Sequence, residues 1–114
     1  MRFHQKGTKM SSTYDRVRTA VLKKQQVVAE YNGHIREMCP HVIGRKNGRE
    51  QVLFYQFGGT SSSKTIIPGS KENWRCIPLD GLRLIEVREG QWHSSSDPSL
   101  PQACVDEIDV EVDY

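Results

Sequence analysis

The sequence predicts a mainly β domain that begins with one helix, an α+β arrangement dominated by strands. Short runs of β-branched and aromatic residues recur between residues 26 and 87 and are separated by glycine-containing turns, a pattern typical of antiparallel strands. Apolar residues at helical spacing occur in one stretch near the N-terminus, which indicates a single helix. The length of 114 residues is enough for one domain with tails.

The helix is expected over about residues 13–24. A hydroxyl side chain at position 12 or 13 can cap its first turn, and Asp15 is favourable there because the helix dipole is positive at that end. Tyr14, Val17 and Val21 are spaced three or four residues apart, so they lie on one face that can pack against a sheet.

Five strands are expected to follow the helix. Their approximate ranges are residues 26–31, 34–38, 49–57, 73–77 and 82–87. Asn32-Gly33 and Asn47-Gly48 come directly before the second and third strands, and Asn-Gly strongly predicts a hairpin turn because both residues accept a positive φ. Pro40 is expected to stop the second strand, since proline has no N–H for a ladder. Residues 78–81 are typical of a tight turn or a single 3₁₀ turn.

Antiparallel strands in a small domain usually curl into a barrel, because closure removes exposed edges. We therefore expect a five-stranded antiparallel SH3-like or Sm-like β-barrel over residues 12–93, with an OB-fold barrel as the structural alternative. Residues 1–11 are polar and aperiodic, so they are expected to be disordered. Residues 94–114 form a Ser/Pro-rich linker and an acidic C-terminal tail. From residue 105 the tail alternates Val and Ile with acids, which favours either an edge strand or a loose end.

The net charge of +2 hides a strong asymmetry along the chain. Residues 1–88 contain 16 basic and 7 acidic groups, or +9, whereas residues 89–114 contain 7 acidic groups and no Lys or Arg, or −7. A basic body suits anionic partners such as phosphates and nucleic acid. The tail either folds back and competes for that basic surface or only increases solubility.

The three cysteines, Cys39, Cys76 and Cys104, are widely separated and odd in number. A metal knuckle needs paired spacing such as C-x-x-C, and a disulfide framework needs an even count. Reduced thiols are therefore expected, together with a reducing compartment.

The N-terminus lacks the apolar core of a secretory signal, and no apolar run approaches the ~20 residues of a membrane helix. The expectation is a cytoplasmic protein without membrane contact.

The order of motifs from residue 31 to residue 82 matches a known pattern. An aromatic residue and a glycine end the first hairpin, an arginine precedes a proline by four residues, and a second arginine leads into a Leu-Asp turn; these residues are Tyr31, Gly33, Arg36, Pro40, Leu53, Tyr55, Arg75, Leu79, Asp80 and Leu82. Over about residues 15–92 the chain resembles the WYL domain of prokaryotes, a small Sm-like barrel. It departs from that family where Gln51-Val52-Leu53 replaces Trp-Tyr-Leu and where Gly81 replaces a second arginine.

The resemblance implies a small standalone sensor or effector module. Such modules bind nucleotides, nucleic acid or other anionic ligands and act in transcriptional regulation or antiviral (phage) defence. We expect the module alone, without a helix-turn-helix regulator domain, because only one helix is readable.

Six residues are the candidate ligand-binding residues: Arg36, His41, Tyr55, Gln56, Trp74 and Arg75. Each arginine can grip a phosphate with its planar guanidinium, or it can be solvated; Arg36 can also pair with Glu30 or Glu37. Arg75 can form a cation–π platform with Trp74 for a nucleobase, unless the indole lies in the core.

The remaining candidates are polar groups within apolar surroundings. Gln56 interrupts an apolar strand and needs a partner, because an unsatisfied buried amide costs on the order of 1–3 kcal/mol; it is a site residue or part of a local network. Tyr55 points to the opposite face of the same strand. His41 can titrate near neutrality and modulate anion binding, or it can be structural.

No series of nucleophile, base and orienting group is legible, and no close pair of carboxylates lies in an apolar setting. The sequence therefore predicts a non-enzyme, with neither cofactor nor metal. The expected partner is an anionic small molecule or single-stranded nucleic acid. The alternative is a protein-interaction subunit in which the barrel edge and the acidic tail bind a protein partner, because an alternating tail can add a strand to an exposed edge.

Overall fold

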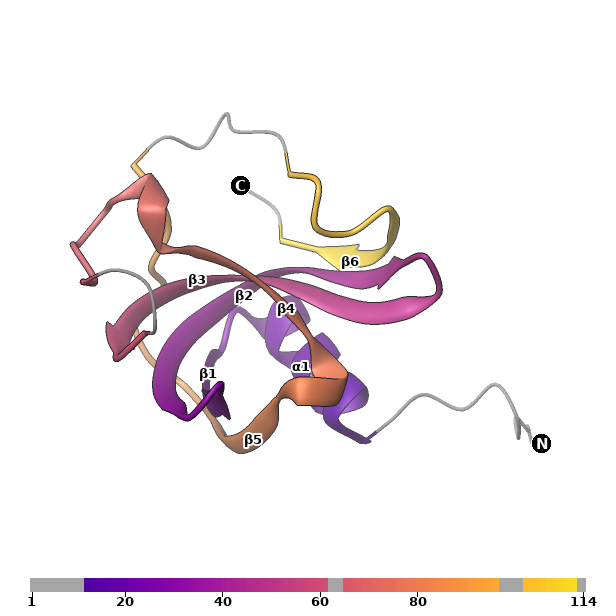
Figure 1. Ribbon diagram of the computed structural model, residues 1–114, viewed down its shortest axis with the longest axis horizontal. Helices are drawn as coiled ribbons and strands as arrows, with labels where there is room; N and C mark the ends of the chain where they lie inside the picture. The colour runs from indigo at the N-terminus through magenta and orange to yellow at the C-terminus, as the bar shows by residue number, and fades with distance from the viewer. Residues whose placement is uncertain (1–11, 62–64, 97–101, 113–114) are drawn as a thin grey trace.

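The computed structural model describes residues 12–61, 65–96 and 102–112 (Figure 1). The predicted disordered segment, residues 1–11, lies outside the described residues, as do residues 97–101 of the linker and the last two residues of the tail. The described chain is mainly β with one N-terminal helix, as predicted. The elements are α1 (Ser12–Lys23), β1 (Gln26–Tyr31), β2 (His34–Lys46), β3 (Arg49–Gly59), β4 (Trp74–Pro78), β5 (Arg83–Arg88) and β6 (Glu107–Glu111), with 3₁₀ turns η1 (Lys71–Asn73) and η2 (Leu79–Gly81).

All strand pairs are antiparallel, and the order in the sheet is β4-β3-β2-β1-β5, with β6 added to β2. β2 is the organising strand: β3 runs along one of its sides, while the other side pairs first with β1 and then with β6. No pairing joins β4 to β5 in the described part of the chain, so the sheet there is not closed.

The prediction that Pro40 ends the second strand is wrong. β2 continues to Lys46, and its register with β3 shifts between Pro40 and Val42. The pairing with β1 ends at Met38, and the pairing with β6 begins at Val42. Pro40 thus lies at a register shift and between the two partners of one side of β2, and such irregularities are where strands accommodate proline.

Both Asn-Gly turns form as predicted. The φ angles are 53° and 77° at Asn32 and Gly33, and 53° and 78° at Asn47 and Gly48. Positive φ at both central residues gives the twist that joins adjacent antiparallel strands. The two turns therefore fix the β1–β2 and β2–β3 hairpins and, with them, the register of the central sheet.

The main core lies between α1 and one face of the sheet (Figure 1). The predicted apolar stripe of α1, with Ala20 added, is fully buried there. Phe54 of β3 and Ile77 of β4 belong to the same cluster. Because side chains alternate along a strand, Gln56 shares the face of Phe54, whereas Tyr55 points to the other face.

The acidic tail forms an edge strand rather than a loose end (Figure 1). β6 pairs with β2 from Val42 to Arg45. The Asp109 carboxylate accepts a hydrogen bond from the Tyr14 hydroxyl at 2.7 Å and forms an ion pair with Arg18 at 3.0 Å. The tail thus lies over α1 and the C-terminal half of β2.

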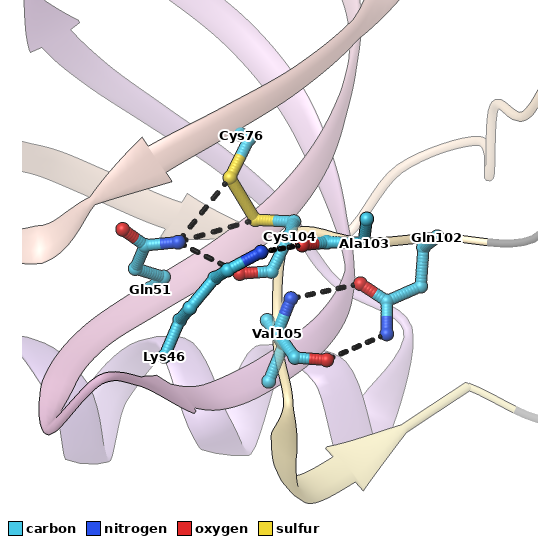
Figure 2. The surroundings of a disulfide bond; sticks show 7 residues. All are labelled: Lys46, Gln51, Cys76, Gln102, Ala103, Cys104 and Val105. Atoms are coloured by element: carbon cyan, nitrogen blue, oxygen red, sulfur yellow. Dashed lines mark hydrogen bonds between the residues drawn. A yellow bond between two sulfur atoms is a disulfide. The ribbon is translucent and has the colours of Figure 1, made fainter.

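The prediction of three reduced thiols is wrong for two of them, because Cys76 of β4 and Cys104 form a disulfide with a Cα–Cα distance of 5.6 Å (Figure 2). An odd count leaves room for one pair and one free thiol. A separation of 28 residues along the chain says nothing about distance in the fold. Cys39 is the free thiol; it is buried, and burial raises its pKa to about 11.

No helix among the described residues is long and apolar enough to cross a membrane.

Candidate functional site

Three of the six candidate residues meet at one amide group. The Gln56 Oε1 atom accepts a hydrogen bond from Arg36 Nη1 at 3.2 Å and another from Arg75 Nε at 3.2 Å. The Gln56 Nε2 atom donates to the backbone carbonyls of Gly58 and Thr60, both at 2.9 Å. These two donations fix the amide so that its oxygen faces the two guanidinium groups.

Arg36 is only 3% exposed. Its Nε and Nη2 atoms donate to the Tyr31 carbonyl at 3.2 and 3.1 Å, and its guanidinium lies 5.4 Å from the centre of the Tyr31 ring. Burial, and then the nearby charge of Arg75, lower the pKa of Arg36. The predicted alternative of a salt bridge to Glu30 or Glu37 is wrong, because those carboxylates pair with other arginines, in β5.

Arg75 is half-buried and lies nearer to the surface. Its Nη1 atom donates to the backbone carbonyls of Glu72 at 2.6 Å and Trp74 at 3.2 Å, and its Nη2 atom lies 3.4 Å from Ser61 Oγ. Burial lowers the pKa of Arg75, while the charge of Glu72 acts in the opposite direction. Among the described residues, neither Arg36 nor Arg75 forms a salt bridge.

The arrangement is electrostatically incomplete. Two cations share one neutral oxygen, and each is partly withdrawn from water; the charge of Glu72 favours the charged form of Arg75, but the salt bridges among the described residues include neither arginine. Partial burial of like charges is unfavourable unless an opposite charge compensates it. What the cluster can do chemically is accept an anion, for which the guanidinium N–H groups provide charge-assisted hydrogen bonds.

The other three candidates form an aromatic group on the opposite face of the sheet. Tyr55 and Trp74 are paired across β3 and β4, and their rings are 5.0 Å apart in an edge-on arrangement. The His41 ring lies 4.8 Å from the Trp74 ring and 4.7 Å from the Trp92 ring. The site residues predicted as one set are therefore two sets, separated by the alternation of strand side chains.

His41 is completely buried. Its Nδ1 atom lies 2.9 Å from the Cys39 carbonyl oxygen, and its Nε2 atom lies 3.2 Å from Ser94 Oγ. Burial lowers the pKa of His41 to about 4. The ring is neutral at pH 7, so the titration near neutrality expected from its unperturbed pKa does not occur, and its position is that of a structural residue.

The predicted platform of Arg75 and Trp74 does not form, because neighbouring residues on a strand point to opposite faces. Trp74 faces the aromatic group. Its Nε1 atom and Asn73 Oδ1 are buried and have no hydrogen-bond partner among the described residues. The cation–π contact near the arginine cluster is instead that of Arg36 with Tyr31.

Two residues of these groups, Trp92 and Ser61, were not among the six candidate residues. The Trp92 ring lies against His41 at a tilt of 32° and comes from a segment without regular secondary structure, so no periodicity pointed to it. Ser61 approaches Arg75 from the loop after β3. The hydroxyl-rich composition of that loop was the available signal.

The comparisons with known proteins add nothing to this geometry: no family model, curated protein or solved structure matches the chain.

Proposed function

We propose that this protein is a small ligand-sensing or regulatory module that binds an anion at Arg36 and Arg75. The anion is a nucleotide or a short single-stranded nucleic acid. The observation that supports this most is that both guanidinium groups share the Gln56 oxygen and that neither has a salt bridge among the described residues.

The three polar residues have different roles in this proposal. Arg75 is the more accessible cation and binds the incoming phosphate, next to the Ser61 hydroxyl. Arg36 lies deeper and adds long-range attraction, because its charge is screened less than a surface charge. Gln56 positions both guanidinium groups, and it leaves them positive because an amide carries no charge.

We further propose that this sheet is a variant of a small β-barrel. The strand order β5-β1-β2-β3-β4, with the single 3₁₀ turn η2 between β4 and β5, supports an SH3-like or Sm-like barrel. The resemblance to WYL domains in motif order then suggests a non-enzymatic role in transcriptional regulation or antiviral defence. A cytoplasmic location is proposed on the same basis.

The binding test uses fluorescence anisotropy with a labelled single-stranded oligonucleotide, together with calorimetric titration of adenosine monophosphate and inorganic phosphate. We expect Arg75→Gln to weaken binding about 10-fold or more, consistent with the loss of one charge-assisted contact. The salt dependence of oligonucleotide binding should also become less steep. The matched control is Arg83→Gln, which removes an arginine that is exposed and pairs with Glu30. Equal losses in the two variants, or no binding at low salt, would refute the proposed site.

A second candidate function is a protein-interaction subunit. The observation that favours it is that β6 pairs with β2 alone among the described strands, so its other edge can pair with a partner strand. The test is co-purification from host lysate with the full chain and with a chain lacking residues 105–114. An unchanged set of captured proteins would contradict this function.

A further inference from the structure

The edge of β2 that holds β6 is shaped to receive a strand. The backbone N–H of Val112 donates to the His41 carbonyl at 2.8 Å, and that of Asp106 donates to the Arg45 carbonyl at 3.0 Å. Between these bonds, a Cβ atom at Gly44 would collide with the Glu107 carbonyl oxygen and with the side chain of Val105. The close approach of the two backbones therefore depends on a glycine at position 44.

The contacts between β6 and its surroundings involve one acidic and two β-branched side chains. The Asp109 carboxylate is held by the Tyr14 hydroxyl and the Arg18 guanidinium. Val112 is buried in the main core, and Val110 packs against it. An aspartate followed by alternating valines thus satisfies one polar and two apolar subsites, which is how strand-addition sites combine backbone pairing with side-chain recognition.

A covalent clasp lies immediately before β6. Cys104 is joined to Cys76 and, with Val105, packs against Val42 of β2. The Gln51 Nε2 atom donates to the Cys104 carbonyl oxygen at 2.7 Å and lies 3.4 and 3.8 Å from the sulfur atoms of Cys76 and Cys104 (Figure 2). The Lys46 ammonium donates to the Ala103 carbonyl at 2.6 Å. The disulfide and two side chains of the β2–β3 hairpin thus hold the segment that leads into β6.

We propose that the β2 edge from His41 to Arg45, together with Tyr14 and Arg18, is a groove for extended acidic peptides with alternating β-branched residues, and that the Cys76–Cys104 disulfide keeps it closed. In the oxidised chain the groove holds the chain's own β6. In the reduced chain β6 dissociates reversibly, and the groove binds a strand of the same chemistry from a partner.

The opening step is a thiol–disulfide exchange with a dithiol reductant. Cys76 is exposed and Cys104 is 7% exposed, so a reductant thiolate attacks the Cys76 sulfur and Cys104 leaves as a thiolate, which then takes up a proton. The second thiol of the reductant displaces Cys76 and closes the reductant's own disulfide. Two electrons and two protons pass to the protein in total. The Gln51 amide N–H near both sulfurs stabilises the departing thiolate.

A reducible disulfide is compatible with the cytoplasmic location proposed above. Disulfides in a reducing cytoplasm are rare, and those that form there are usually transient and redox-sensing. When the disulfide opens, α1 keeps its contacts with β1, β2 and β5, and the main core loses only the part that β6 contributes, including buried Val112.

The first experiment is hydrogen exchange measured by mass spectrometry on the full chain, oxidised and reduced with dithiothreitol. A disulfide between residues 28 positions apart favours the folded over the unfolded state by about two to three orders of magnitude in equilibrium constant. We therefore expect exchange of residues 106–112 to accelerate at least about 10-fold on reduction, while the β1 and β5 amides keep their protection. Cys76→Ser should behave like the reduced chain, and Gly44→Ala should open β6 further in the reduced state.

The second experiment measures binding of a labelled synthetic peptide of residues 102–112 with serine in place of Cys104. The tethered β6 competes at an effective concentration on the order of millimolar, so the peptide is titrated into that range. We expect binding to the reduced chain and to Cys76→Ser, none to the oxidised chain, and at least about fivefold weaker binding of an Asp109→Asn peptide.

Four outcomes would overturn the proposal: unchanged exchange of residues 106–112 on reduction, equal acceleration throughout β1 to β5, equal peptide binding by the oxidised and reduced chains, or no peptide binding by the open chain. None of these readouts depends on the proposed anion site.

Discussion

Substitution of Gln56 by leucine is expected to destabilise the domain by about 3 kcal/mol. The change removes the oxygen shared by Arg36 and Arg75, and hydrogen bonds to charged groups contribute about 1.5–3 kcal/mol each. The bond to half-buried Arg75 contributes less, because water can replace it. Burial of the leucine side chain offsets about 1–2 kcal/mol. The Gly58 and Thr60 carbonyls also lose their donor, but Gly58 is half-buried and Thr60 exposed, so water can replace it. What remains is dominated by a buried cation, Arg36, without its acceptor.

The interpretation predicts strong coupling between positions 36 and 56. Arg36→Met removes the buried charge that makes Gln56→Leu costly, so the double variant should be more stable than the sum of the two single changes by about 1–2 kcal/mol. Urea unfolding followed by fluorescence of the two tryptophans measures all three variants. Gln25→Leu is the control; it removes an exposed glutamine–carboxylate bond and should change stability by no more than about 0.5 kcal/mol.

Two results would refute the reasoning. A loss below about 1 kcal/mol for Gln56→Leu would mean that the shared oxygen is not needed by a desolvated cation. Additive effects of the two substitutions would mean that Arg36 and Gln56 do not act together, and the electrostatic basis of the anion site would fail with them.

Other predictions concern pH, the groove and the clasp. Burial lowers the pKa of His41 from 6.5 to about 4, so the folded state should lose roughly 3 kcal/mol of stability as pH falls from 6.5 to 4, and thermal unfolding of His41→Gln should lack this part of the slope. The pKa of Asp109 is lowered, first by the hydrogen bond from Tyr14. The contribution of the Asp109 carboxylate to stability is therefore present above its ordinary pKa and is lost as pH falls through its lower pKa in the folded state. The protection of β6 amides from exchange should fall with it, and Asp109→Asn should abolish this acid-dependent loss. Gly44→Ala should lower the melting temperature by roughly 5 °C or more, since relief of the collision with Glu107 requires β6 to shift. Cys104→Ser should cost about 2–4 kcal/mol in urea unfolding, and an unchanged midpoint would contradict the clasp.

Local signals in the sequence predicted the helix, the turns and the first five strands. Asn32-Gly33 and Asn47-Gly48 act within four residues, and the apolar stripe of α1 repeats within one element, so neither depends on the rest of the fold. Arg36 and Arg75 were both candidate ligand-binding residues, and the structure brings them to one oxygen.

Features that depend on distant contacts were not predictable in the same way. The disulfide requires β6 to return to β2, which the spacing of Cys76 and Cys104 does not encode. The continuation of β2 past Pro40 requires a change of partner strand at that residue. Strand alternation already placed Tyr55 and Gln56 on opposite faces. The pairing of Tyr55 with Trp74, which puts Trp74 in the aromatic group and Arg75 in the other, is a register that the sequence alone left open.

The planar amide of Gln56 joins the backbone at the end of β3 to the two guanidinium groups. One end holds the backbone of Gly58 and Thr60, and the other holds the cations. Because an amide is rigid, displacement of that backbone rotates the oxygen away from the guanidinium groups. A displacement of the end of β3 and a rearrangement of the two guanidinium groups are therefore coupled through the Gln56 side chain.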